Sequence, residues 1–560
     1  MSTKPWLKNY PTGVQHEIDI NLYDSLNDML DDTIKKYGDK IAYSNMGFEM
    51  SFNDIDRESK KFASYLQNHL KITPGSKVVI QMPNLLQYPI ALYGILRAGL
   101  VAVNLNPLYT LTEMKKSLVD SEAVAIIVFE NIADKLCDVL PETKIKHIVR
   151  TEVGDCFPFV KRTLTNSVIR YVKKMIPDHD LQGTAKKNQA SLHSFNEAIQ
   201  KGSKYLFQKV HVDRSDVALL QYTGGTTGVM KAAVLTHQNM LANQEQMSQW
   251  MSPALEEGNE ISIAALPCYH VFCLTVNCFG FFQRGMHNVL ITNPRDIKGF
   301  LKTIGETKPT VMTAVSTLLG GMLAHEDFNT INWSTLKFTI AGGMALKRSV
   351  ANEWSDRTRT KVIEGYGLTE ASPVVSCNPV DGTDRLGSIG LPLPSTEIKV
   401  IDEDGNDLGL DTPGELCIRG LQVMKEYYKS PEETAKVLTP DGWLKTGDIA
   451  VIDQDGFLAI VDRLKDMIVV SGFNVYPNEI EEAAMMNPKV SEAGVIGVPD
   501  DHSGEAIKIF IVRKDNTLSE NEIRDFLKKS LTGYKKPKYI EFRNELPKNT
   551  VGKVLRRELK

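Results

Sequence analysis

The chain has 560 residues, with 42% hydrophobic and 24% charged side chains and a formal net charge of -4. This length predicts about three or four structural units, and the slight negative charge excludes whole-protein attraction to nucleic acid or anionic lipid, so such binding would need a local patch. The seven cysteines are an odd number without a CxxC pair, which favours scattered reduced thiols over a disulfide framework or a zinc site.

The first half of the sequence alternates helical and strand patterns, as expected for an α/β fold. Helices are predicted over residues 22–37, entered after Asn21, and over 54–70, which is amphipathic. Apolar runs predict buried strands over 77–81, 124–129, 217–220, 311–314 and 338–341. Residues 85–103 and 261–282 are apolar but interrupted by polar residues and prolines, so neither is expected to span a membrane.

The last third of the sequence changes character twice. A β-rich segment begins near Ile389, with strands predicted over 397–401, 414–420 and 449–452 and with DEDGN and DQDG turns between them. From Arg463 onward the pattern predicts short strands over 495–498 and 507–512, a helix over about 520–530 and a basic tail. We therefore expect a large N-terminal part over residues 1–462 and a small α+β domain over residues 463–560.

The segment YTGGTTGVMK, residues 222–231, is the strongest functional signal. Its glycines let the backbone approach a phosphate, its threonine hydroxyls and main-chain N–H groups can donate to phosphate oxygens, and Lys231 supplies positive charge. It is not a Walker A loop, because Lys231 lies between Met230 and Ala232 instead of following glycine and preceding Ser or Thr. The ordinary alternative is a flexible Gly/Thr turn.

Five further segments, read in order with this loop, carry a family resemblance. They are LPCYHVF (266–272), AGGMAL (341–346), EGYGLTEAS (364–372), DGWLKTGDIAVIDQDGFLAIVDRLKDM (441–467) and LPKNTVGKVLRREL (546–559). Over essentially its full length the chain resembles the acyl-adenylate-forming (AMP-binding) ligase superfamily, and it is most similar to bacterial long-chain fatty-acid–CoA ligases. One departure is Met230-Lys231-Ala232, where the family usually has Pro-Lys-Gly.

The resemblance implies an α/β fold in which two α/β subdomains and a small β-rich subdomain form the large N-terminal part. It also implies that the small C-terminal domain is mobile, turns about a hinge at Lys465, and presents one face for each of two reaction steps. Lys553, His270 and Lys231 would be the catalytic residues, and Glu370 with Thr223 would hold Mg²⁺. The residues that would bind ATP are Thr223, Gly224, Gly225, Thr226, Thr227, Gly228, Lys231, Gly343, Glu364, Gly365, Tyr366, Gly367, Thr369, Asp448, Arg463 and Lys553.

Several of these residues have a specific expected contact. Tyr366 would stack on adenine, Asp448 would accept hydrogen bonds from both ribose hydroxyls, and Arg463 would reach the same sugar or the α-phosphate. His270 would lie where carboxylate, adenylate and thiol meet. The ordinary alternatives are a core histidine, glycine-rich turns, a solvated RLKD cluster, and a solvent-facing basic tail that includes Arg556.

The implied reaction joins a long-chain fatty acid to coenzyme A through an acyl-AMP, at the expense of ATP. The alternatives are a fatty acyl-AMP ligase that passes the acyl group to a carrier protein, a ligase for another carboxylic acid, and a non-catalytic relative that binds nucleotide or lipid. No nucleic-acid partner is expected, and a homodimer is left open. The N-terminal MSTKPWLKNYPTG lacks the apolar core of a signal peptide, so we expect a cytoplasmic protein.

Residues 157–177 could bring such a protein to the inner face of the cell membrane. They contain no acidic side chain, and five basic ones: Lys161, Arg162, Arg170, Lys173 and Lys174. A single helical face would carry Val160, Leu164, Val168, Tyr171, Val172 and Met175. This pattern is typical of a helix lying in a lipid interface; the alternative is a helix packed on the main domain with a solvated basic rim.

Overall fold

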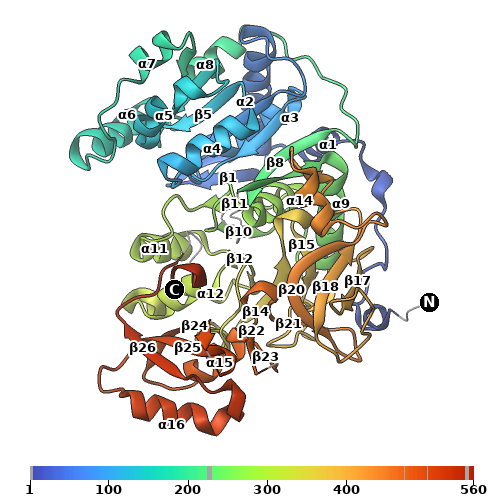
Figure 1. Cartoon of the computed structure of the whole chain (residues 1–560). Coiled ribbons are helices and arrows are strands. Elements are labelled where there is room, and N and C mark those ends of the chain that lie inside the picture. Colours follow the sequence, from blue (N-terminus) through green and yellow to red (C-terminus); the bar gives the residue numbers. More distant parts are fainter. Residues whose placement is uncertain (1–3, 224–229, 472, 501, 549–553, 560) are drawn as a thin grey trace.

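A computed structural model describes residues 4–223, 230–471, 473–500, 502–548 and 554–559 (Figure 1). Two large, mainly parallel sheets dominate it; the nine-stranded sheet has antiparallel strands at both edges, and the eight-stranded sheet has them only at the edge formed by β8, β9 and β19. The eight-stranded sheet has the order β19-β9-β8-β4-β3-β5-β6-β7. Its strands are β3 (Lys77–Gln81), β4 (Val101–Asn104), β5 (Ala125–Phe129), β6 (His147–Thr151), β7 (Ser191–Ser194), β8 (Val217–Thr223), β9 (Lys231–Thr236) and β19 (Glu426–Tyr427).

The second large sheet has nine strands in the order β16-β15-β14-β13-β12-β10-β11-β1-β2. They are β1 (Ile41–Asn45), β2 (Phe48–Ser51), β10 (Ile261–Ala264), β11 (His287–Leu290), β12 (Val311–Ala314), β13 (Phe338–Ala341), β14 (Lys361–Gly367), β15 (Val374–Cys377) and β16 (Leu391–Pro392). The outer faces of the two sheets are covered by α4 (Leu111–Ser121), α5 (Ala133–Val139), α7 (Leu181–Lys187), α11 (Ile297–Thr307), α12 (Ser316–Leu323) and α13 (Arg348–Thr358).

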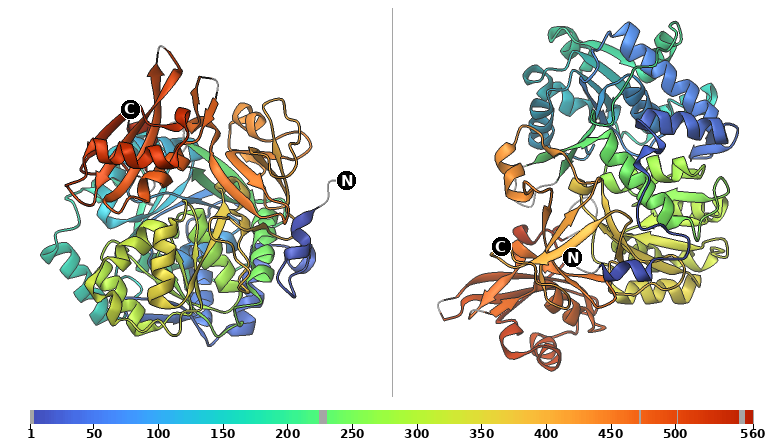
Figure 2. Two further views of the ribbon diagram at one scale, coloured as in Figure 1. Left: turned by 90° about the horizontal axis from the view of Figure 1, so that it is seen from below. Right: turned by 90° about the vertical axis from the view of Figure 1, so that its right-hand side faces the viewer.

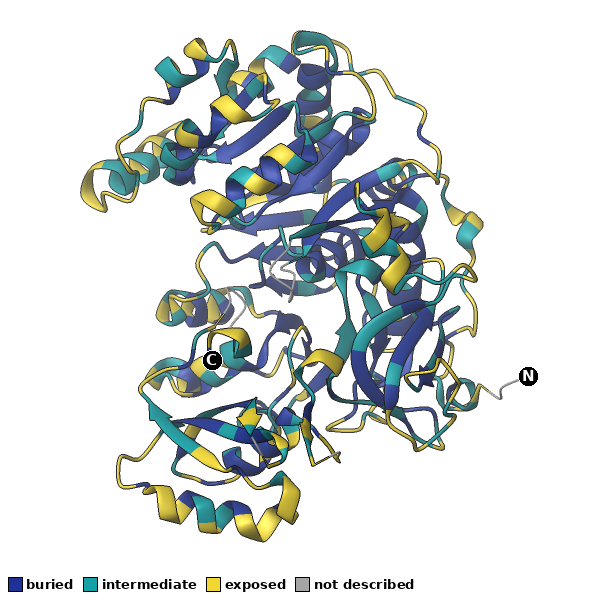
Figure 3. Cartoon of the chain, viewed as in Figure 1, coloured by how far each residue is buried: buried dark blue, intermediate teal, exposed yellow. Residues whose placement is uncertain are grey.

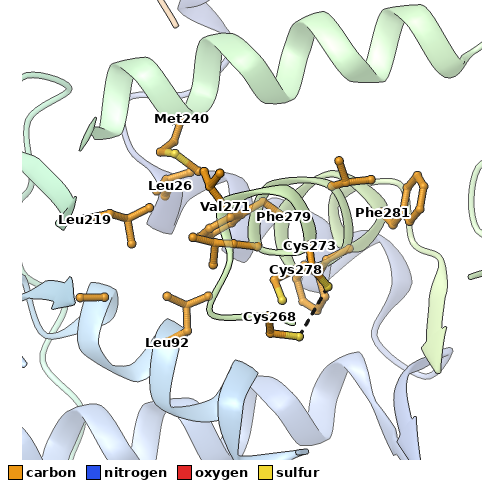
Figure 4. Packing of buried hydrophobic residues seen from close by; sticks show 14 of the residues in the cluster. Leu26, Leu92, Leu219, Met240, Cys268, Val271, Cys273, Cys278, Phe279 and Phe281 are labelled. Atoms are coloured by element: carbon orange, nitrogen blue, oxygen red, sulfur yellow. Dashed lines mark hydrogen bonds between the residues drawn. The ribbon is translucent and has the colours of Figure 1, made fainter. Parts of the chain in front are cut away.

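Neighbouring residues of the central strands face different cores. On β3, Val78 and Ile80 belong to the largest buried cluster, whereas Val79 belongs to a second one. Because strand side chains alternate between faces, both faces of this sheet are buried, which explains its continuous apolar runs. The largest cluster is shared by both sheets (Figure 4) and includes side chains from α1 (Leu26–Tyr37), α2 (Phe52–Ser64), α3 (Gln87–Arg97), α9 (His237–Met251) and the π-helix η7 (Leu274–Phe281).

Two smaller sheets complete the fold. The four-stranded antiparallel sheet has the order β17-β18-β20-β21, with β17 (Glu397–Ile401), β18 (Gly414–Arg419), β20 (Leu444–Ile452) and β21 (Leu458–Arg463). The last sheet contains β22 (Ile468–Val470), β23 (Phe473–Val475), β24 (Val490–Asp500), β25 (Gly504–Arg513) and β26 (Tyr539–Arg543), with α15 (Pro477–Met485) and α16 (Glu520–Ser530). Its two buried clusters use only residues from Ile468 onward, and it forms a lobe of its own (Figure 2).

The predicted fold class is confirmed, while several predicted boundaries are wrong. The first helix begins at Leu26, because the Ser25 side chain accepts a hydrogen bond from the Asp28 N–H and caps it; residues 20–22 form a separate 3-10 turn. The second begins at Phe52, after a capping box between Ser51 and Asp54, and turns π-helical over Tyr65–His69. The boundary between the two parts near residue 463 stays a prediction.

Two chemical features of the described chain concern membranes and thiols. No described helix has the length and apolar character needed to cross a membrane. All seven cysteines are free thiols, and the sulfurs of Cys268 and Cys273 lie 3.7 Å apart in the shared core (Figure 4).

Candidate active site

One cavity of about 1880 Å³ lies where the four sheets meet. It exceeds the roughly 300–1,000 Å³ of an ordinary ligand pocket, so it has room for more than one substrate. Every predicted site residue that the structure describes lines it: Thr223, Lys231, His270, Gly343, Glu364, Gly365, Tyr366, Gly367, Thr369, Glu370, Asp448, Arg463 and Lys465. The predicted loop residues 224–228 and Lys553 lie outside the described residues.

Lys231 is held by side chains from a distant part of the sequence. It begins β9 and pairs with Thr223 at the end of β8, so both ends of the predicted phosphate loop lie side by side. Its ammonium group forms an ion pair with Glu433 of α14 (Pro431–Val437), and it lies 5.0 Å from the centre of the Tyr427 ring. The Lys231 side chain is thus part of the cavity wall and is already paired with the Glu433 carboxylate.

The end of β14 forms another part of the wall. The Glu364 carboxylate accepts a hydrogen bond from the Leu346 N–H at 3.0 Å, and burial raises the pKa of Glu364 to about 7. Gly367 passes so close to the next strand that an added Cβ would lie 2.2 Å from the Pro373 carbonyl oxygen. Only glycine fits there, because any larger residue would force the backbone of the strand to rearrange.

Tyr366, Asp448 and Arg463 form one hydrogen-bonded group. The Tyr366 hydroxyl donates to Asp448 Oδ2 at 2.6 Å, and Arg463 Nε lies 3.1 Å from Asp448 Oδ1. Asp448 and Arg463 face each other directly across β20 and β21, so the sheet itself sets their separation. Since a carboxylate has about four acceptor sites, each Asp448 oxygen keeps one for a further donor.

Glu370 and Lys231 share a partner that the sequence did not reveal. The Tyr427 hydroxyl donates to Glu370 Oε1 at 2.6 Å, while the ring of Tyr427 lies against the Lys231 ammonium. No ion pair to Glu370 is present among the described residues, so its charge is available to a cation. Tyr427 and Glu433 belong to none of the six motifs. The antiparallel pairing of β19 with β9 brings Tyr427 here, and α14, which follows β19 in the chain, carries Glu433.

His270 stands at the N-terminal end of the helical stretch that starts with α10 (Val271–Cys273) and continues through η7. Its Nδ1 accepts a hydrogen bond from the Phe272 N–H at 3.3 Å, and burial lowers the pKa of His270 to about 4. The imidazole is therefore neutral near pH 7. Because Nδ1 is the acceptor, the proton is on Nε2, which can donate to a ligand.

Beyond His270 the cavity wall becomes mainly apolar. The side chains facing it come from the last turns of α9 and from η7: Met247, Trp250, Met251, Val276, Gly280 and Phe281. This wall ends at Arg284, whose buried guanidinium donates to the carbonyl oxygens of Ser248 (3.0 Å) and Leu255 (2.6 Å). From His270 to Arg284 it extends about 20 Å at roughly 1.5 Å per helical residue, which suits an extended long acyl chain.

Lys465 lies at the junction with the C-terminal sheet, in the 3-10 turn η10 (Leu464–Asp466), where burial lowers its pKa. Arg556, for which the sequence left a solvent-facing tail as one alternative, is instead largely covered beside this junction. Its guanidinium bonds to Asp462 (3.0 Å), Asp466 (3.2 Å) and Glu481 (3.0 Å). The end of the chain is therefore anchored to the junction by a buried ion cluster.

Comparisons with known proteins agree with this geometry. The sequence matches the family model "AMP-binding enzyme" over residues 30–428 and "AMP-binding enzyme C-terminal domain" over residues 479–553. Long-chain-fatty-acid–CoA ligases from Yersinia pestis and Haemophilus influenzae are both 48% identical to it, and that from Bacillus subtilis is 37% identical. Each alignment covers 100% of this chain and 98% of the relative.

Solved structures show the same fold. A crystal structure of the anthranilate CoA ligase AuaEII with anthranoyl-AMP matches with a TM-score of 0.83 at 25% identity, covering 96% of this chain and 97% of that chain. ATP-bound MatB from Rhodopseudomonas palustris matches with a TM-score of 0.78 at 26% identity, covering 96% of this chain and 98% of that chain.

Proposed function

The chain belongs to the AMP-binding enzyme family, and we propose that it is a long-chain fatty-acid–CoA ligase that forms AMP and pyrophosphate. The observation that carries the proposal is a single cavity that joins the polar, predicted nucleotide-binding residues to an apolar wall about 20 Å long. Relatives that are 48% identical over the whole chain bear the name of this activity. ATP, coenzyme A and a fatty acid are thus the substrates.

In the first step the fatty carboxylate attacks the α-phosphorus of ATP, and the bond from that phosphorus to pyrophosphate breaks. We assign Lys231 and the loop over residues 223–228 to the phosphates. Lys231 is paired with Glu433 in this structure. When ATP binds, the phosphates would replace or share this carboxylate as the partner of the Lys231 ammonium group. Asp448, with one acceptor site left on each oxygen, would take the ribose hydroxyls beside Tyr366.

The acyl carboxylate would enter past His270. The neutral imidazole of His270 carries a proton on Nε2. This N–H can donate a hydrogen bond to the substrate carboxylate or to the carbonyl of the acyl-AMP. The apolar wall on α9 and η7 would then bury the alkyl chain, with each methylene contributing about 0.8 kcal/mol. Position and electrostatics therefore account for both steps without a covalent enzyme intermediate.

Mg²⁺ fits the residues near the phosphate end of the cavity. Glu370 offers a carboxylate with one oxygen bonded to Tyr427 and no ion pair among the described residues, and Thr223 stands at the end of the adjacent strand. Magnesium takes one or two protein carboxylates and otherwise phosphate and water. When bound, it would neutralise charge on the ATP phosphates.

In the second step the thiolate of coenzyme A attacks the acyl carbon and AMP leaves. We assign the α-phosphate contact of the first step to Lys553 and the turn between the two steps to Lys465, which places the mobile domain over residues 463–560. Lys465 lies at the junction, in a short turn between β21 and β22, where few backbone angles need to change. Homodimer formation also stays a proposal.

The proposal is tested by incubating purified protein with ATP, Mg²⁺, free coenzyme A and saturated acids from short to very long. We expect pyrophosphate, AMP and acyl-CoA in equal amounts, with long-chain acids preferred. Accumulation of acyl-AMP with no acyl-CoA would favour transfer to a carrier protein instead. Absence of pyrophosphate with every acid would refute a ligase altogether.

A further inference from the structure

The far end of the apolar wall carries a buried cation. Arg284 comes shortly after η7 in the chain and lines the active-site cavity, although it is only 5% exposed. The core in which η7 lies is almost entirely buried, whereas exposed residues gather on the outer helices (Figure 3). Among the described residues no carboxylate lies within ion-pair distance of the Arg284 guanidinium. Such a residue is unusual, because charged side chains are almost never fully buried unless they are paired.

The guanidinium of Arg284 has more hydrogen-bond donors than acceptors around it. Of its five N–H groups, the described acceptors are the Ser248 carbonyl oxygen at 3.0 Å, Ser248 Oγ at 3.3 Å and the Leu255 carbonyl oxygen at 2.6 Å. Nε is buried and has no hydrogen-bond partner in the described part of the chain. A buried donor without an acceptor is destabilising. A ligand in the cavity that ends in an oxygen atom at this position would therefore be favoured.

The charges around Arg284 favour an uncharged oxygen over a second anion. Glu257 is paired with Lys36 at 2.5 Å, and Glu260 is paired with Lys337 at 2.6 Å. Burial lowers the pKa of Arg284, and these two carboxylates oppose that effect through space without contacting the guanidinium. A ligand carboxylate placed here would be repelled by both, whereas a hydroxyl group would not. The end of the wall is thus suited to a neutral hydrogen-bond acceptor.

We propose that the enzyme also activates ω-hydroxylated long-chain fatty acids, and that Arg284 and Ser248 bind the terminal hydroxyl. The inference rests on the proposed function, because the carboxyl end of the same acid must react beside His270. The hydroxyl oxygen would accept from a guanidinium N–H and donate its own hydrogen to Ser248 Oγ, which also lines the cavity. The hydroxyl takes no part in the reaction. An ordinary fatty acid ends in a methyl group, which leaves these donors without an acceptor.

The length of the wall predicts which ω-hydroxy acids fit. From His270 to Arg284 it extends about 20 Å at roughly 1.5 Å per helical residue. An extended alkyl chain advances a little less than one C–C bond of about 1.5 Å per carbon, so roughly 14–16 carbons span that distance. A shorter hydroxy acid would place its hydroxyl beside apolar side chains such as Met247 and Phe281, the latter on η7 (Figure 4). Burial of an unpaired hydroxyl there is unfavourable.

The test compares each ω-hydroxy acid with the saturated acid of equal length on the same protein, from short to very long chains. At the matched length, kcat/KM for pyrophosphate release should favour the hydroxy acid about tenfold, the effect of one hydrogen bond to a charged donor. At clearly shorter lengths the saturated acid should be favoured. Calorimetric titration with the same pairs of acids measures their affinities without any reaction.

Variants of the two binding residues locate the effect. Arg284→Met should abolish the preference for the hydroxy acid, because methionine offers no donor, and Ser248→Ala should reduce it about threefold. Since both acids are measured on each variant, any loss of folded protein cancels; should Arg284→Met not fold, Ser248→Ala decides. The matched control is Arg357→Met on α13. Arg357 also donates to a backbone carbonyl, that of Leu323 at 2.7 Å, but lies away from the cavity, so this variant should keep the preference.

Two results would overturn the inference. One is a wild-type enzyme that prefers the saturated acid at every length, which would mean that Arg284 serves only to bind the carbonyl oxygens of Ser248 and Leu255. The other is a preference for the hydroxy acid that persists in both Arg284→Met and Ser248→Ala. Absence of pyrophosphate with every acid would refute the proposed function instead, and the calorimetric comparison would then decide whether the hydroxyl is bound.

Discussion

Replacing Gly280 with leucine should shorten the longest fatty acid that the enzyme activates efficiently. Gly280 lies on η7 in the apolar wall, and an added Cβ would lie 3.1 Å from both Gln244 Oε1 and Met247 Cε. The Thr275 carbonyl oxygen lies 3.3 Å from the same position, so a methyl group fits only if these neighbours give way by a few tenths of an ångström. The larger leucine side chain must extend into the cavity, where it would block the path toward Arg284.

The size of the effect follows from the length of wall that is lost. From Gly280 to Arg284 the wall continues for four residues, about 6 Å at roughly 1.5 Å each, which is about four methylenes with C–C bonds of about 1.5 Å. Each buried methylene contributes about 0.8 kcal/mol, or about a factor of four in kcat/KM. Acids long enough to pass Gly280 should therefore lose up to roughly 200-fold, and shorter acids should lose nothing.

The assay is pyrophosphate release with a panel of saturated acids from short to very long, measured on wild type, Gly280→Ala and Gly280→Leu. The alanine variant, which adds one carbon, should give a smaller shift in the same direction. Rates with the shortest acids serve as an internal control for folding. A uniform fall with every acid, or an unchanged chain-length profile, would refute the assignment of this wall to the alkyl chain.

Four other substitutions test the polar half of the site. Glu433→Gln should lower KM for ATP about fivefold, because a carboxylate no longer competes with phosphate for Lys231. Glu432→Gln is the control, and a raised KM would contradict the proposed replacement of Glu433 by phosphate. Glu364 has a folded pKa of about 7 and an ordinary value of 4.5, so the folded state binds the proton more tightly and wild-type stability falls as pH rises through that window, by about 3 kcal/mol in total. Glu364→Gln should lack this loss in denaturant titrations, and a stability difference that does not vary with pH would contradict it. Lys553→Ala should lower adenylate formation about 10²–10³-fold and spare thioester formation from supplied acyl-AMP; equal loss of both would mean a structural lysine. Lys465→Pro should do the opposite, because proline fixes φ at the proposed hinge, and wild-type CoA transfer would exclude that position.

Sequence patterns located the buried strands better than the strand and helix ends. The predicted strands over 77–81, 311–314, 338–341 and 397–401 coincide with β3, β12, β13 and β17. The first three are buried, mostly apolar runs. β24 was predicted only over 495–498, although it spans Val490–Asp500, because Gly494, Gly497 and Pro499 interrupt its pattern. Its pairing with β25 along the whole length supplies what local propensity lacks.

Residues within a motif could be predicted because their neighbours in sequence identify them. Tyr427 and Glu433 could not, because their roles arise from contacts with Glu370 and Lys231 that only the folded chain creates. The same is true of Gly280 and Arg284, which become part of an acyl wall only when η7 packs beside α9. Long-range pairing of side chains is therefore the information that the six motifs lacked.

A rotation of the C-terminal part about Lys465 would break part of the ion cluster around Arg556. Asp462, which is fully buried, precedes the proposed hinge, whereas Asp466, Glu481 and Arg556 follow it. Rotation would separate Asp462 from Arg556, and a buried carboxylate without its partner costs several kcal/mol.

Asp462 is also the neighbour of Arg463, whose side chain holds Asp448, so the junction and the proposed ribose contact share one short strand end. A nucleotide that binds Asp448 and Arg463 can shift the position of the C-terminal part only to the extent that it binds one arrangement more tightly than the other. An arrangement in which the C-terminal part has turned must therefore supply Asp462 with a new cation or with water.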